Sequence, residues 1–372
     1  MRLTAVLLCF GFVAGLAGGD EAEDRAIAII KKAGAVVKRD KKTTGWDGIC
    51  VSMGLKMSQA EVDAMMANLK YLKDVQRLSV ADKYINDDNL RHVQELTEIR
   101  ELRILDTQIT DAGLRYLGNM KKLEWLDIWP GRITGEGLKH LIGSRQLYGL
   151  DLSDTQVTDS GMDQVGQLKS LKHLRLDRTK ISDRGIPNLK SLTKLEGLGM
   201  SGTALTDNAL AHLGSLTKLK TLDLSRTKIE GHGLKNLASL SNLEDLDLSG
   251  TPFSGNGLEH LRKLDGLREL ILYDTEVTGK GFENFKDMKR LKVLLLTRTP
   301  IEDDALASLR DLTQLEELSL TGTRITDKGL HHLKNLKQLK SLWLGDTGIT
   351  KAGVAELQKA LPKTTINSNP EE

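Results

Sequence analysis

Cysteine is nearly absent from this chain, which contains two cysteines in 372 residues. Cys9 lies in an apolar segment that we expect to be removed on export, so only Cys50 would remain in the mature protein. A single thiol cannot form an internal disulfide, and it cannot supply the several cysteines of a structural zinc site. The mature chain is therefore predicted to fold without a disulfide or a cysteine-based metal site.

Aromatic residues are scarce, and neither sign of charge is in large excess. Only 4% of the residues are aromatic, and 53 basic against 51 acidic residues leave a net charge of +2. This balance argues against a nucleic-acid partner, which needs a basic excess on one face. No apolar run after the N-terminal segment approaches the roughly 20 residues that cross a bilayer. We therefore predict no membrane span in the mature chain.

Residues 1–19 have the pattern of a signal peptide. Arg2 supplies a positive charge, Leu3–Leu16 is an apolar run, and small residues follow at Ala17–Gly19 before the acidic Asp20. The segment predicts an exported protein, whether periplasmic, at the cell surface or secreted. The alternative is an N-terminal helix that stays buried in the fold.

Leucine recurs every 24 residues, and this column fixes the architecture. It runs through twelve positions: Leu78, Leu102, Leu126, Leu150, Leu174, Leu198, Leu222, Leu246, Leu270, Leu294, Leu318 and Leu342. A fixed period of this length indicates a repeat protein in which each unit buries its apolar face against its neighbours. Within residues 147–170, alternating leucines predict a short strand, and apolar residues at three-residue spacing predict a helical segment.

Three further columns are equally regular. Threonine follows the strand in most units, for example Thr155 and Thr203, where its hydroxyl is expected to satisfy the backbone. A second Ser/Thr column, such as Thr206, has the position of a helix N-cap, with Asp207 in the first turn. A glycine column, such as Gly329, is expected to let neighbouring helices approach closely.

The repeat reads LxxLxLxxTxITDxGLxxLxxLxx over about residues 49–366. It resembles the leucine-rich repeat family, in the 24-residue ITDxGL type close to the cysteine-containing subclass, as found in exported bacterial proteins. The resemblance implies an α/β fold: a curved horseshoe-shaped solenoid with parallel strands on the concave face and helices on the convex face.

The ends of the chain depart from the repeat. Residues 1–19 are assigned to the signal peptide, 20–72 to an N-terminal cap with an irregular first repeat, 73–361 to twelve repeats, and 362–372 to a C-terminal cap and tail. Within the first cap we expect a helix over 20–34, strands at 35–37 and 49–51 joined by a polar turn at 41–48, and a helix near 58–72. Terminal repeats must cover the otherwise exposed core.

The first candidate binding surface lies in the third regular unit. Trp125 and Trp129 are predicted to point outward with Asp127 between them, beside Arg103 and Leu105 of the preceding strand. Exposed Trp with Arg nearby is the composition of binding hot spots. The alternative is local packing repair, in which the tryptophans fold over a gap in the array.

The second candidate surface is a small apolar patch. Ile271, Tyr273, Val293 and Leu295 are expected to face outward on two adjacent strands. Exposed apolar patches often mark interaction sites. Self-association through this face, or coverage by a loop, is the alternative. Trp343 is either a third anchor or part of the end cap.

The residues that could suggest a metal site or a catalytic triad are not expected to form one. Five histidines share one helix column in separate, non-consecutive repeats, so they lie too far apart for a common metal: His92, His140, His212, His260 and His332. His173 lies near Ser153 and Asp151, but an open sheet offers no oxyanion hole. We therefore predict no catalytic residues, no metal and no cofactor.

The sequence thus favours an exported, non-catalytic scaffold that binds a protein through its concave face. A carbohydrate-binding or structural protein of the cell envelope is the alternative, with the tryptophans as stacking platforms for a glycan. Cysteine-type repeats also occur in substrate-recognition subunits of ubiquitin ligases, but the export signal argues against that role.

Overall fold

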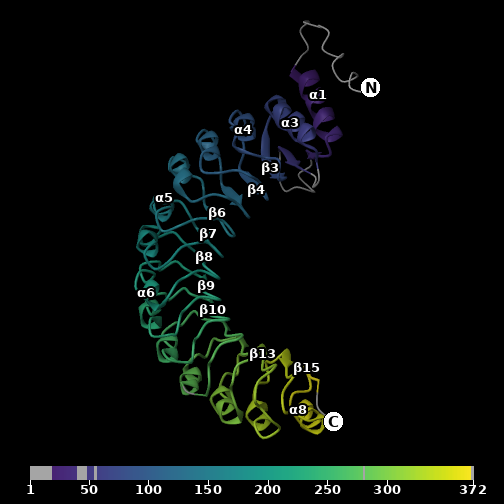
Figure 1. The fold of residues 1–372 in the computed structure, drawn as a ribbon. Coiled ribbons are helices and arrows are strands. Elements are labelled where there is room, and N and C mark those ends of the chain that lie inside the picture. The colour runs from purple at the N-terminus through teal and green to yellow at the C-terminus, as the bar shows by residue number, and fades with distance from the viewer. Residues whose placement is uncertain (1–18, 40–47, 54–56, 280, 370–372) are drawn as a thin grey trace, which may run out of the picture.

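The chain forms an open, curved solenoid (Figure 1). The computed structural model describes residues 19–39, 48–53, 57–279 and 281–369. A 15-stranded sheet follows the order of the sequence and lines the inner side of the arc, while helical segments cover the outer side. The curved α/β solenoid predicted from the leucine column is confirmed. Residues 1–18 of the predicted signal peptide (1–19), residues 41–47 of the predicted polar turn (41–48) and the last three residues of the tail lie outside the described residues.

The N-terminal part has its own topology. It comprises α1 (Gly19–Lys32), β1 (Val36–Lys38), β2 (Ile49–Ser52), α3 (Gln59–Asn68) and η1 (Leu69–Tyr71). β1 pairs antiparallel with β2, and β2 begins the parallel array. Ser58 caps α3 and exchanges hydrogen bonds with Glu61. The apolar faces of α1 and α3 are buried, which supports our proposal that residues 20–72 cap the solenoid.

The remaining strands recur with the leucines. They are β3 (Val75–Ala81), β4 (Glu101–Leu105), β5 (Trp125–Ile128), β6 (Gly149–Asp151), β7 (His173–Arg175), β8 (Gly197–Gly199), β9 (Thr221–Asp223), β10 (Asp245–Asp247), β11 (Glu269–Ile271), β12 (Val293–Leu295), β13 (Glu317–Ser319), β14 (Ser341–Trp343) and β15 (Thr365–Asn367). Residues 24 apart are direct partners, as in Leu222 with Leu246. One column therefore presents one row of side chains across the concave face.

The convex segments are short and mostly 3-10 helical. They are α4 (Asp87–Leu90), η2 (Arg91–Val93), η3 (Gly113–Leu117), η4 (Glu136–Leu141), α5 (Met162–Val165), η5 (Ile186–Ser191), α6 (Asp207–Leu210), η6 (Leu234–Leu237), α7 (Leu258–Leu261), η7 (Phe282–Asp287), η8 (Asp303–Leu309), η9 (Leu330–Leu333) and α8 (Lys351–Ala360). Strands pack about 4.8 Å apart and helices at about 8–10 Å. This mismatch bends the array toward the sheet.

The threonine column satisfies the backbone as expected. In nine units the hydroxyl donates to the carbonyl oxygen three residues earlier, at 2.5–2.9 Å: Thr155, Thr179, Thr203, Thr227, Thr251, Thr275, Thr299, Thr323 and Thr347. These hydroxyls are buried with the turn that leaves the strand. The column therefore satisfies a backbone carbonyl at the point where the chain leaves the sheet.

The second Ser/Thr column needs a correction. Thr206 and Thr350 cap helices as predicted. The main role of the column is different, because its hydroxyls donate at 2.6–2.8 Å to aspartates one repeat earlier, as in Thr326 to Asp303. The aspartates thus tie consecutive repeats together in addition to placing charge in a first helical turn.

The glycine column does allow close approach. A Cβ on Gly329 would lie 2.6 Å from Asp303 Oδ1 and 2.8 Å from Leu306 Cδ1 of the preceding repeat. Any larger residue would push the two convex segments apart. The spacing of the outer layer therefore depends on this column.

Candidate functional site

Trp125 lies at the centre of an aromatic cluster on the concave face. β5 places it beside Gly149 of β6, and its indole crosses the space above that glycine. Its ring centroid is 5.8 Å from that of Tyr148 and 6.0 Å from that of His173, two strands away. The missing side chain at Gly149 is what lets the indole reach His173.

Polar contacts hold this indole in place. Its Nε1–H donates to Asp127 Oδ1, and Arg103 Nε lies 3.2 Å from Asp127 Oδ2. Arg103 also pairs with Glu101 at 2.7 Å. Burial raises the pKa of Asp127, while the Trp125 hydrogen bond and the charge of Arg103 act in the opposite direction. The predicted grouping of Arg103, Trp125 and Asp127 is therefore observed, although Asp127 is buried beneath its neighbours.

Trp129 is the exposed member of the predicted pair. Its side chain is 42% exposed, and its backbone N–H donates to Ile104 O at 3.2 Å, beside Leu105. Among the described rings, Trp125 pairs with Tyr148 and His173 rather than with Trp129. The two tryptophans therefore present separate surfaces: a fixed, half-buried ring and a free one.

Trp125 also forms a wall of two hollows. One, of about 290 Å³, is lined by Trp125, His173, Arg175, Gly197, Gly199 and Thr221 among others. The second, of about 280 Å³, is lined by Arg100, Glu101, Arg103, Glu124, Trp125 and Tyr148. Gly197 and Gly199 lie in the floor of the first hollow, where the His173 ring and the Thr221 hydroxyl approach the first and the Asp177 carboxylate approaches the second.

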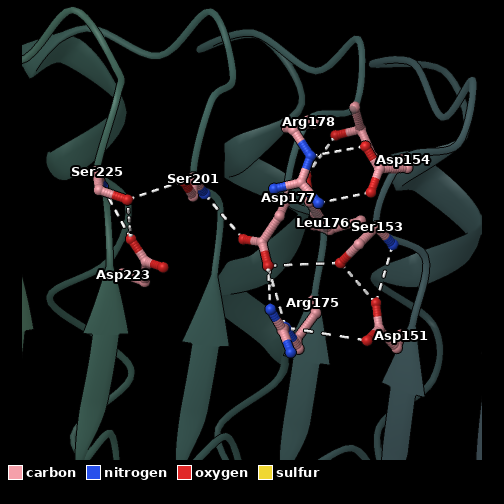
Figure 2. Close-up of polar contacts among 11 residues, drawn as sticks. Asp151, Ser153, Asp154, Arg175, Leu176, Asp177, Arg178, Ser201, Asp223 and Ser225 are labelled. Atoms are coloured by element: carbon pink, nitrogen blue, oxygen red, sulfur yellow. Dashed lines mark hydrogen bonds and ion pairs between the residues drawn. The ribbon is translucent and has the colours of Figure 1, made fainter. Parts of the chain in front are cut away.

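Asp177 is the hub of the polar network beside the first hollow (Figure 2). It is 2% exposed and accepts from Arg175 at 2.8 and 3.0 Å and from the Ser201 backbone N–H at 2.9 Å. Arg175 also approaches Asp151 at 3.9 Å. One arginine therefore pairs with two carboxylates, and these contacts fix the shape of the middle of the floor.

A second arginine pair marks the rim above this network. Arg178 donates to both carboxylate oxygens of Asp154, at 2.6 and 2.5 Å (Figure 2). The hydrogen bond to Arg178 is the main cause that lowers the pKa of Asp154. The Arg178 side chain is 54% exposed and that of Asp154 31%, so solvent screens this pair and it contributes little to stability.

The second predicted patch is placed on the concave face as expected. Ile271, Tyr273, Val293 and Leu295 are each partly buried, and Ile271 lies directly opposite Leu295 on the neighbouring strand. Trp343 on β14 is also partly buried. The apolar patch lies far along the arc from Trp125, so the two candidate surfaces are distinct.

The hydrolase-like set does not assemble. Ser153 Oγ donates to Asp151 at 2.6 Å and lies 3.4 Å from Asp177, whereas the His173 ring packs beside Trp125. Within the described ranges no group of three or more His, Cys, Asp or Glu is placed to hold a metal. No described helix has both the length and the apolar character to cross a membrane.

Sequence reasoning missed part of this site. Tyr148, His173 and Arg175 line the Trp125 surface, and Gly149 makes it possible. The available signal was the row of glycines at 149, 197 and 199 beside a tryptophan. A column position without a side chain creates room that a neighbouring large ring can fill.

Comparisons with known proteins agree with this architecture. Two family models described as Leucine Rich Repeat match parts of the sequence, one over residues 215–238 and 312–333 and the other over 242–264. An internalin from Listeria monocytogenes aligns over 97% of this chain and 100% of its own, with a TM-score of 0.68 and 19% identity. The chain has the fold of a leucine-rich repeat solenoid. No curated protein sequence matches it significantly.

Other leucine-rich repeat solenoids are similar in fold. A leucine-rich repeat protein of Leptospira interrogans aligns over 85% of this chain and 100% of its own, with a TM-score of 0.53 and 18% identity. A plant peptide hormone receptor, RGFR1, in complex with RGF2 aligns over 81% of this chain and 48% of the receptor chain, with a TM-score of 0.56 and 19% identity. At these identities the likeness concerns the fold alone.

Proposed function

We propose that this solenoid is an exported, non-catalytic scaffold that binds a protein partner on its concave face. The observation that carries the proposal is Trp125: a large ring, fixed by Asp127 and neighbouring rings, that separates two hollows on an ordered sheet. A fixed aromatic surface loses little conformational entropy on binding. Trp129, 42% exposed nearby, adds area that a partner can cover.

The rest of the proposal draws on sequence and likeness. Residues 1–19 motivate export, and the ITDxGL pattern motivates the bacterial, cysteine-like subclass. The receptor complex with RGF2 is an example of a similar fold in a complex, although it is only 19% identical. The proposed contacts are Arg103, Leu105, Trp125, Asp127 and Trp129, with Ile271, Tyr273, Val293 and Leu295 as a second area.

Affinity capture tests the proposal. The mature protein, immobilised, is exposed to envelope and culture-medium extract of its source organism beside a Trp125→Ala/Trp129→Ala variant. A Tyr71→Ala/Ile142→Ala variant is the control, because both residues are exposed apolar side chains of the helical layer, 47% and 39% exposed. A protein retained by wild type and control but lost by the tryptophan variant supports the proposal. Retention by all three would remove the site assignment.

A folding control separates binding from packing. The tryptophan variant should keep a cooperative urea transition, because Trp129 is exposed and Trp125 is only half-buried. Loss of that transition would favour the packing-repair interpretation. Retention of polysaccharide without any protein would overturn the choice of a protein partner.

A further inference from the structure

The concave floor differs in charge between its two halves. On β4–β7 the floor carboxylates are ion-paired to arginines: Glu101 and Asp127 to Arg103, Asp151 and Asp177 to Arg175. On β10–β13 four further carboxylates face the same side, and none has an ion pair with a residue that the structure describes: Asp245, Asp247, Glu269 and Glu317. We call these four residues the acidic floor.

The acidic floor borders the second apolar patch. Asp245 and Asp247 lie on β10, Glu269 pairs directly with Val293, and Val293 in turn with Glu317 on β13. Val293 therefore lies between Glu269 and Glu317, and Ile271 lies beside Asp247. No Lys or Arg occupies the outward positions of these four strands.

Three nearby cations are engaged in ion pairs at the rims. Lys292 pairs with Glu316 at 2.6 Å, Arg298 with Asp274 at 2.5 Å, and Arg268 lies 3.8 Å from Glu244. The charges of Arg268 and Arg226 reach Asp245 and Asp247, but burial and neighbouring acids outweigh them, so the pKa of both carboxyls is raised. The pKa of Glu269 is also raised, by burial and then by its acidic neighbours.

We propose that the β10–β13 floor docks a cationic, apolar polypeptide segment, whose aliphatic side chains cover the patch and whose Lys or Arg side chains reach the acidic floor. This inference rests on the proposed function, since it names the partner chemistry of the second area. Charge complementarity selects the occupant: unneutralised acids repel an acidic segment and attract a basic one. Four strands span about 14 Å, roughly the length of four to five extended residues.

A peptide series tests this inference. A short labelled peptide of lysine and leucine in equal numbers is titrated against the mature protein and followed by fluorescence anisotropy. Companion peptides replace lysine by glutamate, or leucine by serine. The lysine–leucine peptide should bind, and both companions should bind at least roughly tenfold more weakly, since each removes one half of the complementarity. Equal binding of the glutamate peptide would overturn the inference.

Matched variants locate the site. Asp247→Asn/Glu269→Gln removes two charges without changing volume and should weaken binding roughly tenfold. Glu283→Gln/Asp287→Asn makes the same charge change on exposed convex residues of η7 and should bind like wild type. Ile271→Ser/Leu295→Ser should weaken binding while far-UV circular dichroism stays unchanged. Equal weakening by the convex pair would mean general charge attraction and would overturn the site.

The Trp125→Ala/Trp129→Ala variant separates this inference from the proposed function. It should bind the lysine–leucine peptide like wild type, because the tryptophans lie on β5 and just after it, away from β10–β13. If the floor variants bind the peptide unchanged while the tryptophan variant still loses its captured protein, the inference fails alone. If no protein is captured by wild type, the proposed function fails irrespective of the peptide result.

Discussion

The indole of Trp125 occupies the space that a side chain at Gly149 would fill, so that a methyl group there would overlap the ring. Gly149→Ala should therefore move the indole of Trp125 although the tryptophan itself is not substituted. We expect a loss of about 1–3 kcal/mol in the free energy of unfolding from overpacking. Near-UV circular dichroism should lose intensity at the tryptophan bands.

Gly143→Ala is the matched control for that change. A Cβ at Gly143 would meet only Lys121 Nζ at 3.4 Å, an ordinary contact, so spectrum and stability should stay near wild type. A Gly149→Ala protein with an unchanged spectrum would contradict the described position of the indole.

The threonine column should carry measurable stability. Thr203→Val keeps the shape but removes the hydroxyl that donates to Met200 O at 2.7 Å. The buried carbonyl then loses a partner, so urea unfolding should show a loss of about 1–2 kcal/mol. Thr217→Val, at an exposed position, should have little effect. Equal losses from both would indicate a general effect of valine rather than this hydrogen bond.

We expect the ion pairs of Glu316 to make the free energy of unfolding depend on pH in the acid range. Hydrogen bonds from Lys292 and Lys340 lower its pKa from 4.5 to about 2. A carboxylate with a lowered folded-state pKa contributes stability that is full above pH 4.5 and is lost as the pH falls toward 2. The difference in melting temperature between wild type and Glu316→Gln should be constant from pH 7 to 5 and disappear near pH 2. A difference that grows on acidification would contradict the pairing.

For Asp247 we expect the opposite effect of ionisation on stability. Its raised pKa means that the folded state disfavours the charged form, so ionisation destabilises the protein at neutral pH and protonation relieves this. Asp247→Asn should therefore raise the melting temperature at pH 7 and lose its advantage in acid. The gain should stay below about 1 kcal/mol, because solvent screens a partly exposed carboxylate. A lower melting temperature at pH 7 would show that the charge is stabilising.

The sequence alone was sufficient to predict the order and register of the strands in the sheet. Leu222 and Leu246 are paired because identical units stack in register, and a column of leucines leaves no other register that buries them. The role of Thr203 also followed from its position at the end of the strand. By contrast, the hydrogen-bond partner of Asp303 could not be predicted from the sequence. In a periodic sequence a partner in the same repeat and one in the next repeat fit the same pattern. The structure shows that Asp303 bonds to Thr326 of the next repeat.

The candidate site was only partly predictable. The strand alternation placed Trp125, Asp127 and Arg103 on one face, and they do contact one another. It gave no indication that the indole would turn toward His173, because side-chain direction depends on the space above Gly149. The difference in charge between the two halves of the floor was also not predictable, because it depends on which carboxylates have an arginine within ion-pair distance in the structure.

Site-specific photocrosslinking tests the central claim most directly. A benzophenone amino acid in place of Trp129 on the concave side, or of Ile142 on the convex side, is irradiated in envelope and medium extract of the source organism. We predict a discrete, protease-sensitive adduct from position 129 that position 142 does not give. The same adducts from both positions, or a protease-resistant glycan adduct alone, would contradict a protein-binding concave face.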